Sequence, residues 1–266
     1  MARYLNGATI MTTPTPRSLA VAREAGFDGI EARAERLLDG SEELRATASA
    51  VRPGEVWSLN GIRVSLEADG SLDRELLETD LDARLGVCRA IGAAHLLAVP
   101  PRIAGLSEQA ARRGVRDGLE VARERAAAIG VGIAFEFLGF ADCPIRTPEA
   151  AGQLLEGLEG VELVLDSCHW HASGAESLDA FPVERLAMVH INDAPQKPPP
   201  EIEDGDRLMP GLGVIRLPWL IGALQARGFA GPWSLETFNP GYWAEDPRLV
   251  AQRGAAALDF LLAAKS

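Results

Sequence analysis

Short apolar runs rich in β-forming residues alternate along the chain with longer amphipathic segments. Across Thr79–Ile91 the apolar residues recur every three or four positions, the spacing of a helix with one buried face. The stretch Ser107–Ile129 is rich in Ala, Arg and Glu and is followed by Gly130, which predicts a second long helix ended by glycine. At Thr147-Pro148, a threonine N-cap followed by proline predicts the start of another helix.

Eight apolar runs have the length and composition of buried strands. The predicted strands are Asn6–Ile10, Phe27–Arg33, Val56–Ile62, Ala94–Pro100, Val131–Phe137, Val161–Asp166, Leu186–Asp193 and Gly231–Phe238. Strands that alternate with helices over 266 residues predict a single (β/α)8 TIM barrel of the α/β class, spanning residues 1–266. The alternative is an open doubly wound sheet. It is disfavoured because no glycine-rich phosphate-binding turn follows the first strand and polar residues gather at many strand ends.

Composition and charge limit the classes of molecule that the protein is expected to bind. The chain is 47% hydrophobic and 24% charged, as in an ordinary globular domain, and its formal net charge is -12. A field of that sign repels nucleic acid and anionic lipid, so we expect neither as a partner. Three cysteines are too few for a disulfide framework, and no apolar run approaches the roughly 20 residues that span a bilayer. We therefore expect a soluble cytoplasmic protein, and the sequence leaves association into a homo-oligomer open.

Four of the predicted strands end in residues that can bind a metal. They are Glu136, Asp166, His190 and Glu236, at the ends of the fifth to eighth strands. Because the carboxyl ends of barrel strands surround one site, these side chains are expected to converge. Three carboxylates and one imidazole suit one divalent ion such as Zn, Mn, Co or Mg. Each residue taken alone could instead cap a helix or form an ion pair.

Further polar and aromatic side chains lie near the same strand ends. His169, Trp170 and His171 follow Asp166, where they could contact substrate hydroxyls or a sugar ring face, or simply pack against a loop. Asn60 interrupts an apolar strand, where a buried amide needs a partner and a substrate hydroxyl could supply one.

A long loop, Ala194–Gly213, contains five prolines and the acidic run EIEDGD. Irregular loops of that length are usually functional or mobile. Arg207 lies in this loop, between the acidic run and a Pro-Gly turn, and could act as a lid residue that brings a cation to substrate oxygens.

The runs IAFEFLG, LVLDSCHWHASG, VHINDAP, DRLMPGLGVI and SLETFNPGYW resemble the sugar isomerase/epimerase family of xylose isomerase-like TIM barrels. Weaker likeness in LNGATI, GIEAR, SLNGI and LLAVP extends the resemblance over nearly the whole chain. It implies metal ligands at Glu136, Asp166, His190 and Glu236, and substrate contacts from His169 and Arg207. The proline-rich stretch Gln196–Glu203 departs from the family.

These residues favour a metal-dependent isomerase or epimerase acting on an α-hydroxy ketone of a sugar or cyclitol, of the inosose type. Glu136 and Glu236 would remove and return a proton while the metal stabilises an enediolate. The alternative is a metal-dependent dehydratase of inosose or 3-dehydroshikimate. A non-catalytic polyol-binding protein is a third hypothesis. Phosphodiester cleavage would require more metal ligands and a basic groove. The net charge of -12 disfavours such a groove.

Overall fold

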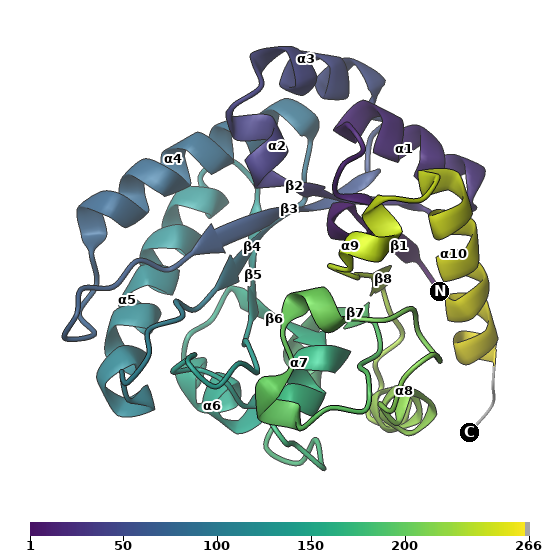
Figure 1. Cartoon of the computed structure of the whole chain (residues 1–266). Coiled ribbons are helices and arrows are strands. Elements are labelled where there is room, and N and C mark those ends of the chain that lie inside the picture. Colours follow the sequence, from purple (N-terminus) through teal and green to yellow (C-terminus); the bar gives the residue numbers. More distant parts are fainter. Residues whose placement is uncertain (264–266) are drawn as a thin grey trace.

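The computed structural model describes residues 1–263. Eight parallel strands form a closed barrel in sequence order, and β1 pairs with β8 to close it. Figure 1 shows the barrel from one end, with helices around its outside. The strands are β1 Arg3–Asn6, β2 Gly29–Arg33, β3 Val56–Arg63, β4 His95–Val99, β5 Gly132–Glu136, β6 Val161–Asp166, β7 Leu186–Ile191 and β8 Trp233–Leu235. The predicted (β/α)8 barrel is confirmed.

Ten α-helices are present within the described residues. They are α1 Thr15–Glu24, α2 Ala34–Leu38, α3 Ser41–Ala50, α4 Arg74–Ile91, α5 Glu108–Ala127, α6 Pro148–Leu154, α7 Ser167–Ala172, α8 Leu217–Ala226, α9 Pro240–Trp243 and α10 Pro247–Ala263. Four 3-10 turns are η1 Gly7–Ile10, η2 Val183–Arg185, η3 Pro199–Glu201 and η4 Asp204–Asp206. None of the helices within residues 1–263 is long and apolar enough to cross a membrane.

Capping residues account for the boundaries of several helices. The Asp73 side chain accepts a hydrogen bond from Leu76 N at the start of α4, which ends at Gly92 with a left-handed φ of 65°. Ser107 caps α5 in the same way. Thr147 caps α6 with Pro148 at the first helical position, as predicted.

The prediction for the first strand was wrong. The first strand is Arg3–Asn6, and the residues after it form the turn η1, because the Asn6 side chain accepts a hydrogen bond from Ala8 N and starts a helical turn. His169 and His171 lie on the short helix α7, where no helix had been predicted. The Asp166 side chain caps that helix by accepting a hydrogen bond from His169 N at 2.8 Å.

The buried apolar side chains of the described residues form three groups, the smallest of them Leu138, Phe140 and Cys143. The largest group lies between barrel and helices, and a second cluster contains Trp57, Leu97, Ala134, Val164 and Met188. Side chains alternate between the two faces of a strand. The strand-end residues Glu136, Asp166 and His190 come two positions after members of the second cluster, so they point to the same side, into the barrel.

Candidate metal centre

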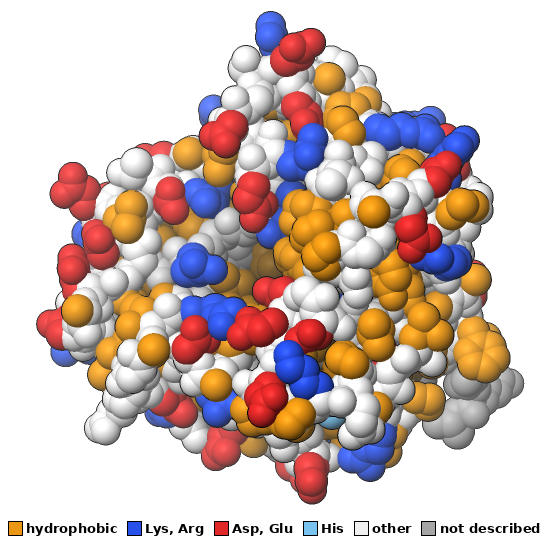
Figure 2. Space-filling view, viewed as in Figure 1, with side chains coloured by type: hydrophobic (Ala, Val, Ile, Leu, Met, Phe, Trp, Pro, Cys, Tyr) orange, Lys and Arg blue, Asp and Glu red, His pale blue; other side chains and the backbone are white. Residues whose placement is uncertain are grey.

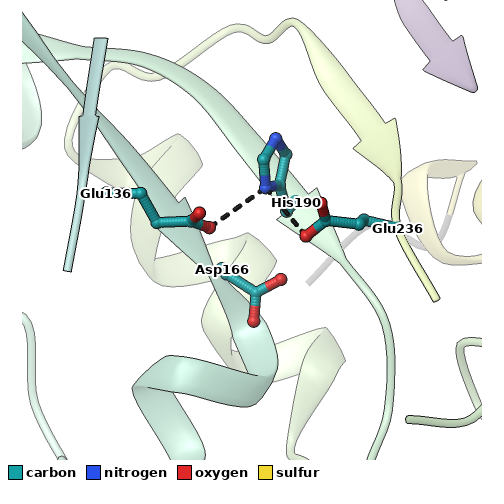
Figure 3. A group of neighbouring side chains, drawn as sticks. All are labelled: Glu136, Asp166, His190 and Glu236. Carbon is teal, nitrogen blue, oxygen red and sulfur yellow. Dashed lines mark hydrogen bonds and ion pairs between the residues drawn. The ribbon is translucent and has the colours of Figure 1, made fainter. Parts of the chain in front are cut away.

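Four side chains converge at the carboxyl end of the barrel. Glu136 of β5, Asp166 of β6, His190 of β7 and Glu236 after β8 each offer a ligand atom, and these atoms lie within 4.8 Å of one another. Figure 3 shows His190 between the two glutamates, with its Nδ1 3.1 Å from Glu136 Oε1 and 3.2 Å from Glu236 Oε2. All four residues are at most 3% exposed. The predicted convergence of these strand ends is therefore present.

Crowding of buried carboxylates shifts the proton affinities within this group. Burial, with Glu236 and Asp166 nearby, raises the pKa of Glu136 to about 7 despite His190. Burial and Glu236 also raise the pKa of Asp166 to about 6, although Arg207 opposes this. Burial disfavours the charged form of Glu236 too, but His190 and Arg207 hold the pKa of its carboxyl well below the ordinary range.

The donor set fits a divalent cation. Burial, and to a smaller extent the neighbouring carboxylates, disfavour the charged forms of Glu136 and Asp166. A cation among them offsets that repulsion and the loss of hydration. Oxygen donors with one imidazole nitrogen match Zn, Mn, Co and Mg. The four residues could therefore hold the predicted ion.

Arg207 approaches the group from the long loop after β7. Its Nη1 donates to Asp166 Oδ2 at 3.0 Å and to Glu236 Oε2 at 2.7 Å, while Nη2 lies 2.9 Å from His169 Nε2. The guanidinium is buried despite its place in a loop. Because arginine only donates, His169 Nε2 accepts this hydrogen bond and the proton of the neutral ring is on Nδ1.

The loop that carries Arg207 is held by Asp193. Its carboxylate accepts hydrogen bonds from the backbone N–H groups of Ala194, Gly211, Gly213 and Ile215, at 2.9 to 3.0 Å. Its own backbone pairs in both directions with Leu208, the residue after Arg207. One buried carboxylate therefore fixes both sides of the loop.

A cavity of about 570 Å³ opens onto the candidate centre. Glu136 and Glu236 line it together with Asn60, His169 and Arg207, three of the residues predicted to bind substrate. Figure 2 shows the hollow in this face of the molecule, with basic and acidic side chains around it. A volume of this size admits a small polyol.

The structure places Trp170 and His171 outside the lining of this cavity. Successive residues of an α-helix point about 100° apart, so His171 faces about 200° away from His169. Trp170 stacks on Trp219 of α8, with ring centroids 5.6 Å apart. The predicted contacts of Trp170 and His171 with substrate do not fit this arrangement, because neither residue lines the cavity. The prediction did not include the helix that separates these side chains from His169.

Two buried polar residues were missed by sequence reasoning. Glu31 of β2 is fully buried, and His190 Nε2 lies 3.2 Å from its Oε2. Asn192 donates from Nδ2 to Asp166 Oδ2 at 2.6 Å and to the Glu236 carbonyl at 2.9 Å. The place of Glu31 between Ile30 and Ala32 in the strand GIEAR was a usable signal, because a carboxylate is rarely buried without a partner.

The family model described as xylose isomerase-like TIM barrel matches residues 19–261, and the chain belongs to that family. An inosose isomerase of Bacillus velezensis is 29% identical over 250 residues, which cover 90% of this chain and 89% of that protein. A 3-dehydroshikimate dehydratase of Pseudomonas aeruginosa is 30% identical over 96% of this chain, which spans only 41% of that protein.

Among solved structures, a crystal structure of IolI protein with a bound zinc atom superimposes with a TM-score of 0.87. The two sequences are 26% identical, and the match covers 99% of this chain and 98% of that one. The family expected from the sequence runs is thereby confirmed.

Proposed function

We propose that this protein is a divalent-metal-dependent isomerase of an inosose, a cyclitol α-hydroxy ketone. The observation that best supports this proposal is the buried group of three carboxylates and one imidazole, two of whose carboxylates line the 570 Å³ cavity. The likeness to inosose isomerase over 90% of the chain supports the substrate class. The zinc in the related IolI structure supports the metal.

Glu136, Asp166, His190 and Glu236 would hold the ion, with Zn, Mn, Co and Mg as candidates. When bound, a divalent cation supplies stabilisation of the negative charge that develops on a ketone oxygen as the α-proton leaves. Asn192 donates to Asp166 Oδ2 and so orients this carboxylate toward the centre.

Two glutamates are the candidates for moving the proton. Glu136 and Glu236 come from opposite sides of His190 and both line the cavity. A substrate bound in the cavity would lie against both carboxylates, whose ligand atoms are within 4.8 Å of each other. One glutamate would remove the α-proton and the other would deliver a proton to the neighbouring carbon.

His169, Arg207 and Asn60 would bind substrate oxygens. Burial and Arg207 hold the pKa of His169 well below its ordinary range, so the ring is neutral. Among the described residues, neither His169 Nδ1 nor Asn60 Nδ2 has a hydrogen-bond partner. Buried donors of this kind are costly unless a ligand satisfies them, and both residues line the cavity.

Dehydration of 3-dehydroshikimate is a second candidate, favoured by one observation. Five arginines line the cavity, and four of them form ion pairs with carboxylates. Within residues 1–263, Arg63 makes no ion pair and lies at the end of β3 on the cavity wall. A free guanidinium there could bind the carboxylate of a shikimate-type substrate, which an inosose lacks.

We further propose that the protein acts in the cytoplasm on this small molecule and has neither nucleic acid nor membrane as a partner. Its association into a homo-oligomer is a question for solution measurements. The buried free thiols of Cys88, Cys143 and Cys168 support a reducing compartment. The net charge of -12 is unfavourable for binding nucleic acid.

The test is a proton NMR screen of inososes, ketoses and 3-dehydroshikimate in deuterium oxide, with metals added one at a time. Isomerisation through proton removal predicts a shifted carbonyl position and deuterium in the product. A conjugated enone with strong ultraviolet absorbance would indicate the dehydratase instead. Tight binding with no chemical change in any substrate would favour a binding protein.

Glu236→Gln is expected to keep the fold and abolish deuterium incorporation, because the amide cannot accept the proton. Glu162→Gln is the matched control, since Glu162 lies on β6 with a half-exposed side chain that pairs with His95. Undiminished exchange in Glu236→Gln would count against its role in proton transfer.

A further inference from the structure

Glu31 is a buried acidic residue that the proposed chemistry does not use. It lies in the middle of β2 and is 0% exposed. Among residues 1–263 no arginine or lysine pairs with it. A buried carboxylate without a cation is costly unless hydrogen bonds satisfy its oxygens. Its partners therefore decide what it does.

Three neutral donors from three strands converge on this carboxylate. Asn6 Nδ2 of β1 donates to Oε1 at 3.1 Å, and Ser58 Oγ of β3 donates to Oε2 at 2.7 Å. Ser234 Oγ of β8 also donates to Oε1. Since these strands lie on both sides of β2 in the barrel, the carboxylate is fixed in position from both directions.

The remaining contact is with His190. Its Nε2 lies 3.1 Å from Oε1 and 3.2 Å from Oε2, so the ring nitrogen faces both oxygens of the carboxylate. An acceptor that already receives hydrogen bonds on each oxygen can hold Nε2 only if that nitrogen carries a hydrogen. In the neutral ring that a metal ligand requires, the lone pair is then on Nδ1, which faces Glu136 and Glu236.

We propose that Glu31 is a positioning residue that fixes the ring orientation and tautomer of His190, so that Nδ1 is the atom presented to the metal. This inference rests on the metal site of the proposed function. Carboxylates that accept the second N–H of a ligating histidine orient the ring and raise its basicity. Glu31 lies on the opposite side of the ring from the other carboxylates and is not itself a ligand.

The first test uses the zinc-loaded wild-type protein and needs no variant. Only four histidines are present in the chain, so the ring nitrogen resonances of His190 can be assigned. Long-range nitrogen-proton NMR correlations should show a hydrogen on Nε2 and none on Nδ1. A hydrogen on Nδ1, or zinc bound through Nε2, would overturn the inference.

The second test measures zinc affinity by competition with a chelator. Glu31→Gln should weaken zinc binding by about 10- to 100-fold, the usual effect of removing such a partner. Glu31→Asp retains the negative charge but moves the carboxylate away from the His190 ring by the length of one methylene group. It is the variant to measure if Glu31→Gln does not fold. Glu55→Gln is the control, because Glu55 is also buried and hydrogen-bonded but pairs with Arg23 outside the centre.

Zinc affinity within twofold of wild type in Glu31→Gln and Glu31→Asp would overturn the positioning role while leaving the proposed isomerase intact. A wild-type protein that binds no divalent ion would overturn the proposed function as well. The two failures are therefore distinguishable.

Discussion

Replacing Asp193 with Asn tests how the loop that carries Arg207 is held in place. Each carboxylate oxygen accepts two backbone N–H groups, Oδ1 from Ala194 and Ile215 and Oδ2 from Gly211 and Gly213. An asparagine keeps the shape but replaces one oxygen with an NH2 group that only donates. Two backbone N–H groups therefore lose their acceptor whichever way the amide is oriented.

The size of the loss follows from these contacts. A hydrogen bond to a charged group contributes about 1.5 to 3 kcal/mol, so two lost bonds cost about 3 to 6 kcal/mol if the loop stays closed. The loop can also open and let water satisfy the freed groups, which limits the cost. We therefore expect a fall of about 3 kcal/mol in the free energy of unfolding, a large share of the roughly 5 to 15 kcal/mol typical of a domain.

The assay is urea denaturation combined with amide hydrogen exchange. Exchange at Gly211, Gly213 and Ile215 should accelerate most, and kcat/KM should fall because Arg207 is no longer held at the candidate centre. Asp259→Asn is the control, since Asp259 is an exposed partner of Arg3 and such pairs contribute about 1 kcal/mol or less. A loss below about 0.5 kcal/mol in Asp193→Asn with unchanged exchange would refute the reasoning.

Two further predictions concern single side chains. Glu55→Gln should destabilise the protein at neutral pH, because the side chain of Arg23 lowers the pKa of Glu55 despite its burial. Glu55 then contributes stability above its unfolded pKa of about 4.3, and this stability is lost as pH falls through the lower folded pKa. The urea denaturation curves of variant and wild type should therefore converge in acid. A constant difference down to pH 3 would contradict this. His169→Asn should raise KM or lower kcat at least tenfold while His171→Asn changes neither much, as only His169 lines the cavity; equal effects in steady-state kinetics would argue against the assignment.

The barrel could be predicted because each part of the pattern agreed with the others. Apolar runs, helix caps and strand-end carboxylates all repeat with the period of a (β/α)8 chain, and Glu136, Asp166, His190 and Glu236 stand where strands end. Convergence of strand ends is a property of the fold, so the candidate ligands followed from the topology alone.

Other features depend on contacts that sequence periodicity does not encode. The helix α7 is only six residues long, and its cap is Asp166, which also faces the centre through its second oxygen. Without that helix, His171 could not be separated from His169. Sequence analysis did not single out Glu31, because its partners Asn6, Ser58 and Ser234 come from three other strands of the barrel.

The most direct test of the central claim is the metal dependence of inosose isomerisation. Protein freed of metal with a chelator is titrated with zinc, while proton NMR follows an inosose in deuterium oxide. We predict that isomerisation and deuterium incorporation rise together and saturate at one ion per chain, and that neither occurs in the metal-free protein. Full activity without metal, or saturated zinc binding with no turnover of any inosose, would contradict the account.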